Sequence, residues 1–386
     1  MLKNLRFINS PVSVIIFLNL SIILCWMGWA VFYSLSAAIN IPTFHLDGAF
    51  QTASGLYRLD SGQIPGKDFY PYLGIGPLLV LYPFFKAFGA NISASVFSAQ
   101  LVVLLIGMLS TALIWQLIWR PKSFVTSLAV GSVLFLTPFA VSIFLSQPLP
   151  VWMEFGVSPG NSLRPIRAAA PYLIVIAYYF FIFRINKPQK KYILSGLLTG
   201  SVLLWSNDFA IPSAGLFAIF VFITALRCRE FLIKNSLFYL VATIISWMTF
   251  LTFATYGHPM ELLKYNFLDV AQDQWWFFGP YGESTRIFYL QKLTRIFSQE
   301  NYIPLLVLAL MAVLASITRL IEHVLLLWIG VVLFAGGVAA SVGGHLGHYF
   351  GAFYFWGMTA IYVGMFRLAW LGMRKLSDKV TSHKSQ

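Results

Sequence analysis

The segment SVFSAQLVVLLIGMLSTALIWQLIW, Ser95–Trp119, contains 25 residues and no charged side chain. The hydrocarbon core of a bilayer is about 30 Å thick, and an α-helix of about 20 apolar residues spans it. Arg120 and Lys122 follow the segment directly, and basic residues beside a span collect on the cytoplasmic side. The segment therefore predicts a transmembrane helix whose C-terminal end faces the cytoplasm.

The composition extends this interpretation to the whole chain. Of its 386 residues, 59% are hydrophobic and only 10% are charged, whereas about a quarter are charged in a soluble domain. This excludes an ordinary soluble enzyme and a disordered chain. The net charge of +13 would suggest nucleic acid in a soluble protein, but in a membrane protein it first reports orientation. We therefore expect one all-α polytopic membrane domain over residues 1–386, with membrane lipids and no nucleic acid as partners.

Apolar runs near span length predict about ten transmembrane helices. They are Val12–Phe32, Ser95–Trp119, Phe124–Leu145, Ala168–Phe183, Tyr192–Trp205, Phe209–Leu226, Leu237–Tyr256, Ile303–Ile317, Val324–Val342 and Ala352–Phe366. The run Pro77–Phe88 has only 12 residues and contains Pro83 and Lys86. It suits a juxtamembrane or re-entrant helix better than a span.

With ten spans, both termini and the most basic turns lie on one side of the membrane. That side holds 17 Lys/Arg and 3 Asp/Glu, and the other side holds 9 and 10, which recovers the totals of 26 and 13. The positive-inside rule makes the first side cytoplasmic. The larger loops then all face outward: Asn40–Ala94, Gln147–Arg167, Gly257–Asn301 and Gly343–Gly351. We therefore expect any chemistry at the extracytoplasmic surface.

The first outer loop, residues 40–94, carries the strongest candidates. Its pattern predicts a helix from Asp47 to Arg58, which Ser61-Gly62 ends. Eleven residues at about 100° each make three turns, so Asp47 and Arg58 fall on nearly the same face. Asp68 follows in a turn rich in glycine and proline. The alternative is a solvated interfacial helix with an ordinary surface carboxylate, and the spacing leaves both interpretations open.

From Asp47 onward, about 45 residues resemble the first extracytoplasmic loop of GT-C fold glycosyltransferases. These membrane enzymes include the dolichyl-phosphate-mannose protein mannosyltransferases and the bacterial aminoarabinose transferases. The features that carry the resemblance occur in the family's order: Asp47, Gly62, Asp68-Phe69, Gly76-Pro77-Leu78 and Phe88-Gly89. The resemblance implies juxtamembrane helices in this loop. It also implies transfer of a sugar from a polyprenyl-phosphate donor to an extracytoplasmic glycan, lipid or protein acceptor.

A lipid phosphate is already a good leaving group, so this transfer needs one carboxylate base and cations that hold the phosphate. The resemblance assigns the base of an inverting attack to Asp47. Arg58, Asp68 and Lys86 are substrate-binding candidates, with Lys67 as a further cation. Gly48 follows Asp47, and the second outer loop has no D-x-D. We therefore expect no cofactor, and the pattern does not favour the divalent metal of oligosaccharyltransferase-like members.

The second outer loop, Gln147–Arg167, adds three substrate-binding candidates. Arg164 and Arg167 are three residues apart at the start of a predicted helix, where they could share a face and clamp a phosphate. Glu154 is the second-choice acid. The alternative, in which both arginines anchor the loop to lipid headgroups, stays open.

Two further candidates depend on their context. His348-Tyr349 resembles the His-Tyr pair at the start of a late span in many GT-C relatives, where the histidine lies near the donor phosphate. His345 and His348 also have the spacing of a metal pair, but no third ligand is evident, and an interfacial histidine is equally consistent. Asp208 lies at a membrane boundary, where we favour a helix cap over a functional role.

The last large outer loop, residues 257–301, predicts an amphipathic helix on the membrane surface, followed by the aromatic run Trp275–Phe278. The run is typical of an aromatic belt. It also suits a lid whose indoles stack on sugar rings while Arg286, Lys292 or Arg295 contacts phosphate.

These patterns favour a hexosyl or pentosyl glycosyltransferase in the plasma (inner) membrane. The alternative is a transporter or flippase of lipid-linked sugars, since ten spans with few internal charges also suit a permeation path. Transporters usually show paired broken helices and charges near the bilayer midplane, and the chain shows no inverted repeat. A third hypothesis, a non-catalytic scaffold, predicts that no single outer carboxylate matters.

Overall fold

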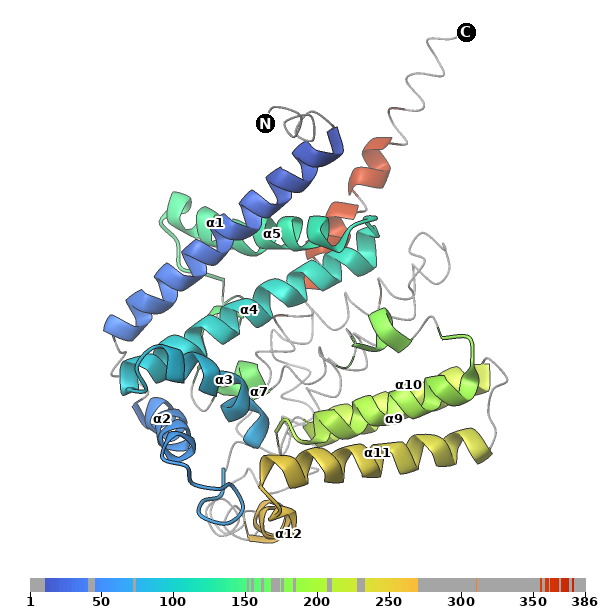
Figure 1. The fold of residues 1–386 in the computed structure, drawn as a ribbon. Helices are drawn as coiled ribbons and strands as arrows, with labels where there is room; N and C mark the ends of the chain where they lie inside the picture. The colour runs from blue at the N-terminus through green and yellow to red at the C-terminus, as the bar shows by residue number, and fades with distance from the viewer. Residues whose placement is uncertain are drawn as a thin grey trace, which may run out of the picture.

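The computed structural model describes residues 11–40, 46–71, 74–150, 185–206, 210–227 and 233–269, together with parts of 153–182 and 355–377 and the single residue 310. Its helices are α1 (Pro11–Ile39), α2 (Leu46–Asp60), α3 (Ile75–Ala87), α4 (Ile92–Trp119), α5 (Phe124–Leu145), α7 (Arg164–Arg167), α9 (Pro188–Leu203), α10 (Ala210–Arg227), α11 (Ile233–Ala254) and α12 (Pro259–Lys264), with π-helical turns η4 (Tyr178–Ile182) and η5 (Tyr265–Asp269). Within these residues the fold is all-α, without a named strand (Figure 1).

Four of the described helices are long and apolar enough to cross a membrane. These are α1 from Ser13 onward, α4, α5 and α11, and each coincides with a predicted span. Helices α9 and α10 lie where two shorter spans were predicted. Of the other four predicted spans, Ala168–Phe183 and Ala352–Phe366 are described only in part, and the two between Ile303 and Val342 are not described apart from Leu310, so the count of ten stays a prediction. Helix α3 has 13 residues with Pro83 inside, which confirms a helix too short to span.

Local chemistry sets the ends of the helices around the first loop. The Asn91 side chain accepts a hydrogen bond from the Ala94 N–H at 2.8 Å and caps the start of α4. Arg120, at the other end of α4, has φ 53 and donates its N–H to the Gln116 carbonyl, a left-handed C-terminal cap. Helix α2 ends before Gly62, whose φ of 77 suits glycine. The predicted stop at Ser61-Gly62 is therefore confirmed.

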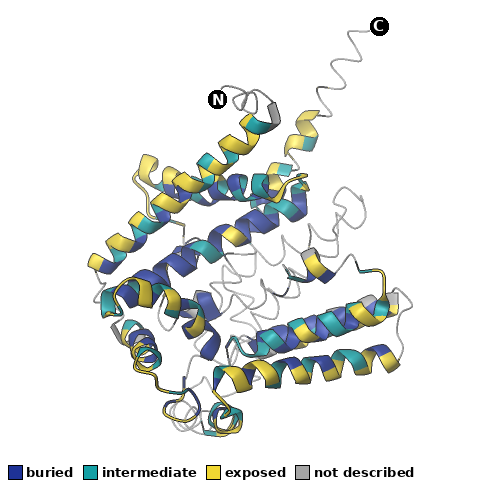
Figure 2. Cartoon of the chain, viewed as in Figure 1, coloured by how far each residue is buried: buried dark blue, intermediate teal, exposed yellow. Residues whose placement is uncertain are grey.

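Helix α4 is the centre of the described bundle. It is buried along most of its length, whereas α1 exposes large apolar side chains such as Phe17 and Phe32 (Figure 2). Trp26 of α1, Phe97 of α4 and Phe135 of α5 are each 1% exposed and belong to one core cluster. The exposed apolar surface of α1 is what a lipid-facing helix requires, since lipid tails are as apolar as the side chains they contact.

Helices α9 and α11 form a second closely packed pair and run in the same direction. Gly196 faces the Tyr239 carbonyl and Gly200 faces the Thr243 carbonyl. Residue numbers therefore rise in the same direction on both helices, which makes them parallel. A Cβ on either glycine would lie 2.3 Å from that carbonyl oxygen. Small residues four apart let two membrane helices approach closely. The motif Gly196-x-x-x-Gly200 is therefore a packing motif that the sequence analysis missed.

The two ends of the bundle differ in charge. Helices α2, α3 and α12 lie at one end, and the α4–α5 connection lies at the other (Figure 1). Every acid with a described side chain lies at the first end, which we call the acidic end: Asp60, Asp68, Glu261 and Asp269. The described basic side chains at the opposite, basic end are Arg120, Lys122, Lys187, Lys190, Lys191, Lys234, Arg367 and Arg374. Among the described side chains, the helix directions thus place all the acids at one end and these cations at the other, while the number of spans and the side that each end faces stay predictions.

The close approach of α9 and α11 makes a specific stability prediction. We expect Gly200→Ala to destabilise the detergent-solubilised protein by about 1–3 kcal/mol, because the added methyl overpacks the contact. Gly215→Ala on α10 is the matched control, since no atom lies within 4 Å of its added Cβ. Thermal unfolding of both variants measures the difference, and equal melting temperatures would contradict the observed packing.

Candidate functional site

The first-loop helix α2 packs with one face and exposes the other. Thr52, Ala53 and Leu56 are buried, at 3%, 2% and 0% exposure. Phe50 and Arg58 are exposed. The helix therefore lies against the bundle along its apolar side, as an amphipathic juxtamembrane helix does.

Asp47 is the second residue of α2, and its side chain lies outside the described residues. The continuous helix from Leu46 to Asp60 confirms the geometry that puts positions 47 and 58 at nearly the same angle around the axis. Arg58 donates to the Gln63 Oε1 at 3.3 Å, and its Cζ lies 5.7 Å from the centre of the Phe69 ring. These contacts hold the guanidinium near the first loop while leaving it exposed.

An ion pair joins the end of α2 to α3. The Lys86 ammonium donates to the Asp60 Oδ1 at 2.6 Å, and the Tyr82 hydroxyl donates to the same oxygen at 3.2 Å. The hydrogen bond from Lys86 lowers the pKa of Asp60, and the Asp60 carboxylate raises the pKa of Lys86. Lys86 was predicted to bind substrate. The structure places it in a helix-to-helix ion pair with Asp60, an acid that the sequence analysis did not single out.

Asp68 shapes the turn after α2. Its Oδ2 accepts a hydrogen bond from the Ile64 N–H at 2.8 Å, and the Gly66 N–H donates to the Phe69 carbonyl at 2.8 Å. Gly66 has φ 86, and a Cβ there would lie 2.6 Å from the His258 carbonyl oxygen. Asp68, predicted to bind substrate, thus has a defined structural role in a turn that packs against the start of α12.

The second-loop segment around Arg167 packs onto the first loop. The Trp205 Nε1 donates to the Ile166 carbonyl at 2.6 Å. Leu163 and Ile166 belong to the same buried cluster as Leu56 of α2. Arg167 itself is 6% exposed. Arg164 starts the short helix α7, but its side chain lies outside the described residues.

Trp205 is the residue that holds these loops together, and the sequence analysis missed it. A Cβ at Gly76 would lie 2.6 Å from the Trp205 Cα, so the start of α3 contacts Trp205 directly. In the first loop after the Asp68 turn, Tyr70 stacks on Tyr265, which follows α12, with ring centroids 4.8 Å apart. A tryptophan at the end of a predicted span is typical of an interfacial anchor. The local sequence therefore gave no sign that Trp205 contacts the first and second outer loops. Segments from three predicted outer loops meet at the acidic end.

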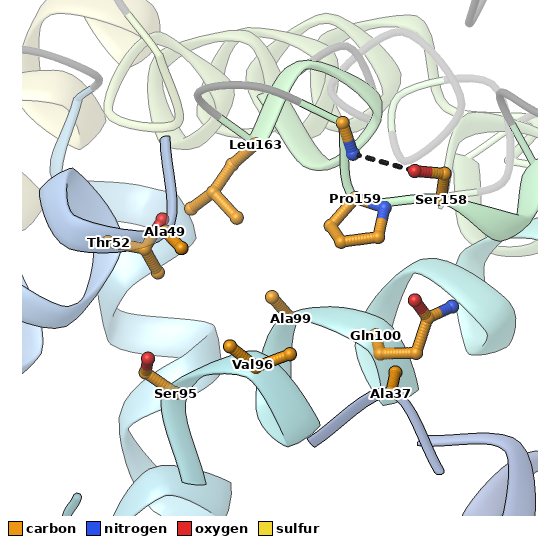
Figure 3. Close-up of a pocket in the computed structure, with 11 residues that line it drawn as sticks. Ala37, Ala49, Thr52, Ser95, Val96, Ala99, Gln100, Ser158, Pro159 and Leu163 are labelled. Atoms are coloured by element: carbon orange, nitrogen blue, oxygen red, sulfur yellow. Dashed lines mark hydrogen bonds between the residues drawn. The ribbon is translucent and has the colours of Figure 1, made fainter. Parts of the chain in front are cut away.

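A cavity of about 140 Å³ lies where α1, α2 and α4 meet the 158–163 segment (Figure 3). Its walls are mostly small side chains, including Ala37, Ala49 and Ala99. Its polar lining residues are Thr52, Ser95, Gln100 and Ser158, and none of the described residues that line it is charged. The Gln100 Nε2 donates to the Val157 carbonyl, and the Ser158 Oγ accepts from the Gly160 N–H. The Gln100 carbonyl and the Ser158 hydroxyl proton can therefore serve a neutral hydrogen-bonding ligand.

The structure brings Arg58, Asp68, Lys86 and Arg167 to one end of the bundle, but not to one point. Arg58, Asp68 and Lys86 each have a separate partner. Several predicted residues lie outside the described residues: Glu154, Asp208, Trp275–Phe278, Arg286, Lys292, Arg295, His345, His348 and Tyr349. Within the described residues, no three His, Cys, Asp or Glu side chains group to hold a metal ion.

Comparison with known proteins found no matching family model, no similar curated protein and no similar solved structure.

The Asp60–Lys86 pair makes a pH prediction. The folded-state pKa of Asp60 is lowered. The Asp60 carboxylate therefore stabilises the folded protein at any pH above the pKa that Asp60 has in the unfolded chain, and this stabilisation is lost as the pH falls through the folded-state pKa. We expect Asp60→Asn to lower the melting temperature at neutral pH, and the gap from wild type to close on acidification.

Thermal unfolding across the acidic range measures this gap. Glu261→Gln removes an exposed acid at the same end and serves as the control, for which no comparable closing gap is expected. An Asp60→Asn gap that stays constant at every pH would show that the ion pair does not stabilise the fold.

Proposed function

We propose that the protein is a membrane glycosyltransferase of GT-C type that uses a polyprenyl-phosphate sugar. The observation that carries the proposal is the assembly at the acidic end, where α2 and the residues 163–167 pack together beside one cavity. The sequence predicts these roles separately: α2 supplies the base, Asp47, and the second-loop segment supplies the phosphate-binding cations Arg164 and Arg167. Their proximity supports a shared site, and the resemblance of the first loop supplies the reaction class.

In the proposed reaction the Asp47 carboxylate takes the proton of an acceptor hydroxyl or amine. The acceptor atom then attacks the anomeric carbon from the face opposite the phosphate. As the new glycosidic bond forms, the bond from the anomeric carbon to the phosphate oxygen breaks, and polyprenyl phosphate leaves with the electron pair. The anomeric configuration inverts. One base and one cluster of cations therefore suffice.

Cations at the acidic end would hold the departing phosphate. Arg164 and Arg167 remain the principal candidates, with His348-Tyr349 as a further contributor. Arg58 is the better first-loop candidate, because it is exposed and shares the helical register of position 47. Lys86 would first have to leave the Asp60 carboxylate. We therefore assign Lys86 to holding α3 against α2 rather than to the phosphate.

The cavity beside α2 suits the uncharged part of a substrate. A phosphate buried among Ala37, Ala49 and Ala99 would lack a compensating charge, which is costly. Neutral hydroxyl groups instead match the hydrogen-bonding capacity of Ser95, Gln100 and Ser158. We assign the cavity to a sugar ring, of the donor or of the acceptor, and the phosphate to the arginines of the acidic end. The active site would face the extracytoplasmic side of the plasma membrane, with both termini cytoplasmic.

The base assignment predicts a loss of rate. We expect Asp47→Asn to lower sugar transfer by roughly 10²–10⁴-fold, the usual contribution of a general base. Transfer from a radiolabelled polyprenyl-phosphate sugar in membranes with equal amounts of each variant measures the effect. Glu261→Gln removes an exposed acid at the same end and should keep its activity. Full activity in Asp47→Asn would exclude Asp47 as the base.

The cavity assignment predicts a steric effect. Ala99 is 4% exposed and lines the cavity, so Ala99→Leu fills it. We expect transfer to fall roughly tenfold to a hundredfold, because the substrate is displaced from its reactive position. The melting temperature should change little, since the larger side chain enters empty space. Leu109→Phe, an exposed change on the same helix, is the control. Unchanged transfer by a folded Ala99→Leu protein would show that the cavity holds no part of the substrate.

A further inference from the structure

Aromatic side chains and an arginine form a cluster at the basic end, opposite the proposed active site. The rings of Trp115 and Trp119 stack with centroids 4.4 Å apart and 14° between their planes. The Arg367 Cζ lies 5.0 Å from the centre of the Trp119 ring. Trp370, from the same C-terminal segment as Arg367, lies 6.3 Å from Trp119. The described helical residues 362–367 and 369–374, drawn red, lie beside the C-terminal end of α4 (Figure 1).

The cluster presents N–H donors without an acceptor. The Trp119 Nε1 and the Arg367 Nε are both buried, and neither has a hydrogen-bond partner in the described part of the chain. Buried donors are normally satisfied, and a guanidinium over an indole is held in place by the cation–π attraction. Arg367 as a whole stays partly exposed. The site therefore holds a cation in place beside an indole, and the partly exposed Arg367 side chain can meet a negatively charged acceptor.

The neighbouring charges make an external anion the natural acceptor. Arg120 and Lys122 follow Trp119 directly, and Arg374 follows Arg367 by two turns. No acid with a described side chain lies at this end, so the described residues offer no carboxylate partner. Basic pockets between membrane helices attract anionic headgroups in this way.

The surface next to Arg367 is apolar and open. Phe366, Trp370 and Met373 are 49%, 50% and 58% exposed, and their spacing puts them along one side of the helix. A soluble anion gains nothing from such a surface. A lipid gains contacts for its acyl chains below the position where its phosphate meets Arg367.

We propose that the cluster of Trp115, Trp119, Arg367 and Trp370 binds one anionic phospholipid from the leaflet at the basic end. The phosphodiester accepts hydrogen bonds from Arg367, with Trp119 as the aromatic platform. The acyl chains run along Phe366 and Tyr362, which precede Arg367 in the helix and so lie on its membrane side. This site is independent of the proposed glycosyl transfer, because it lies at the opposite end of the bundle.

Thermal unfolding of delipidated full-length protein in a neutral detergent tests the site. The probes are phosphatidylglycerol, phosphatidylcholine and glycerol phosphate, each titrated separately. A ligand that binds only the folded state raises the melting temperature in a saturable way. We expect phosphatidylglycerol to do so, and the other two to have little effect. Equal stabilisation by phosphatidylcholine would overturn the anionic requirement, and equal stabilisation by glycerol phosphate would overturn the lipid assignment.

Variants then locate the site. Arg367→Gln should weaken the apparent affinity for phosphatidylglycerol roughly tenfold, as expected for loss of a charge-assisted contact. Arg374→Gln removes the same charge from an exposed position on the same segment and should bind normally. An equal loss in both variants would show a general charge effect and refute the site. Should Arg367→Gln fail to fold, Arg367→Lys keeps the charge without the planar guanidinium, and an unchanged affinity in that variant would refute the site as well.

Discussion

The described structure depends on the burial of one charge-free helix. Within a bilayer every backbone N–H and C=O must be paired inside the protein, so a spanning segment is helical and its charges are displaced to its ends. Helix α4 meets this constraint most fully, because α1, α5 and the first-loop helices enclose it. Its N-terminal end then carries α2, α3 and the Arg167 segment. Its C-terminal end carries the Trp119–Arg367 cluster. The first-loop assembly and the Trp119–Arg367 cluster therefore lie at the two ends of the same buried helix, where polar side chains can be accommodated.

The separation of charge gives the two ends different chemistry. At the acidic end, carboxylates and cations occur together, and the Asp60–Lys86 pair and the Asp68 turn fix the shape of the loop. A cavity beside α2, with small and uncharged described lining residues, can hold an uncharged ring there. At the basic end the charged side chains among the described residues are all cationic, which suits anionic headgroups rather than acid–base chemistry. The proposed catalytic and lipid sites therefore do not compete for the same residues.

Much of the local structure could be predicted from the sequence. The span at Ser95–Trp119, the helix from Asp47 to Arg58 and the short helix at Pro77–Phe88 depend on hydropathy, length and Gly62, and these signals are local. The contacts that organise the site are not local. Trp205 reaches the Ile166 carbonyl 39 residues away along the chain, and Asp60 meets Lys86 26 residues away. Lys86 and Asp68 looked like free polar groups, because nothing in their own segments reveals these partners. Gly196 and Gly200 carried a recognisable motif that was overlooked.

In the proposed orientation the acidic end, with α2 and its cavity, faces outward. Labelling with a membrane-impermeant maleimide tests it in intact cells, after Cys25 and Cys228 have been replaced by alanine. Ser61→Cys reports the turn after α2, and Ser123→Cys reports the connection between α4 and α5; both serines are exposed. The account predicts that Ser61→Cys is labelled in intact cells, and that Ser123→Cys is labelled only after permeabilisation. The reverse pattern would place α2 in the cytoplasm and contradict both the orientation and the proposed transfer.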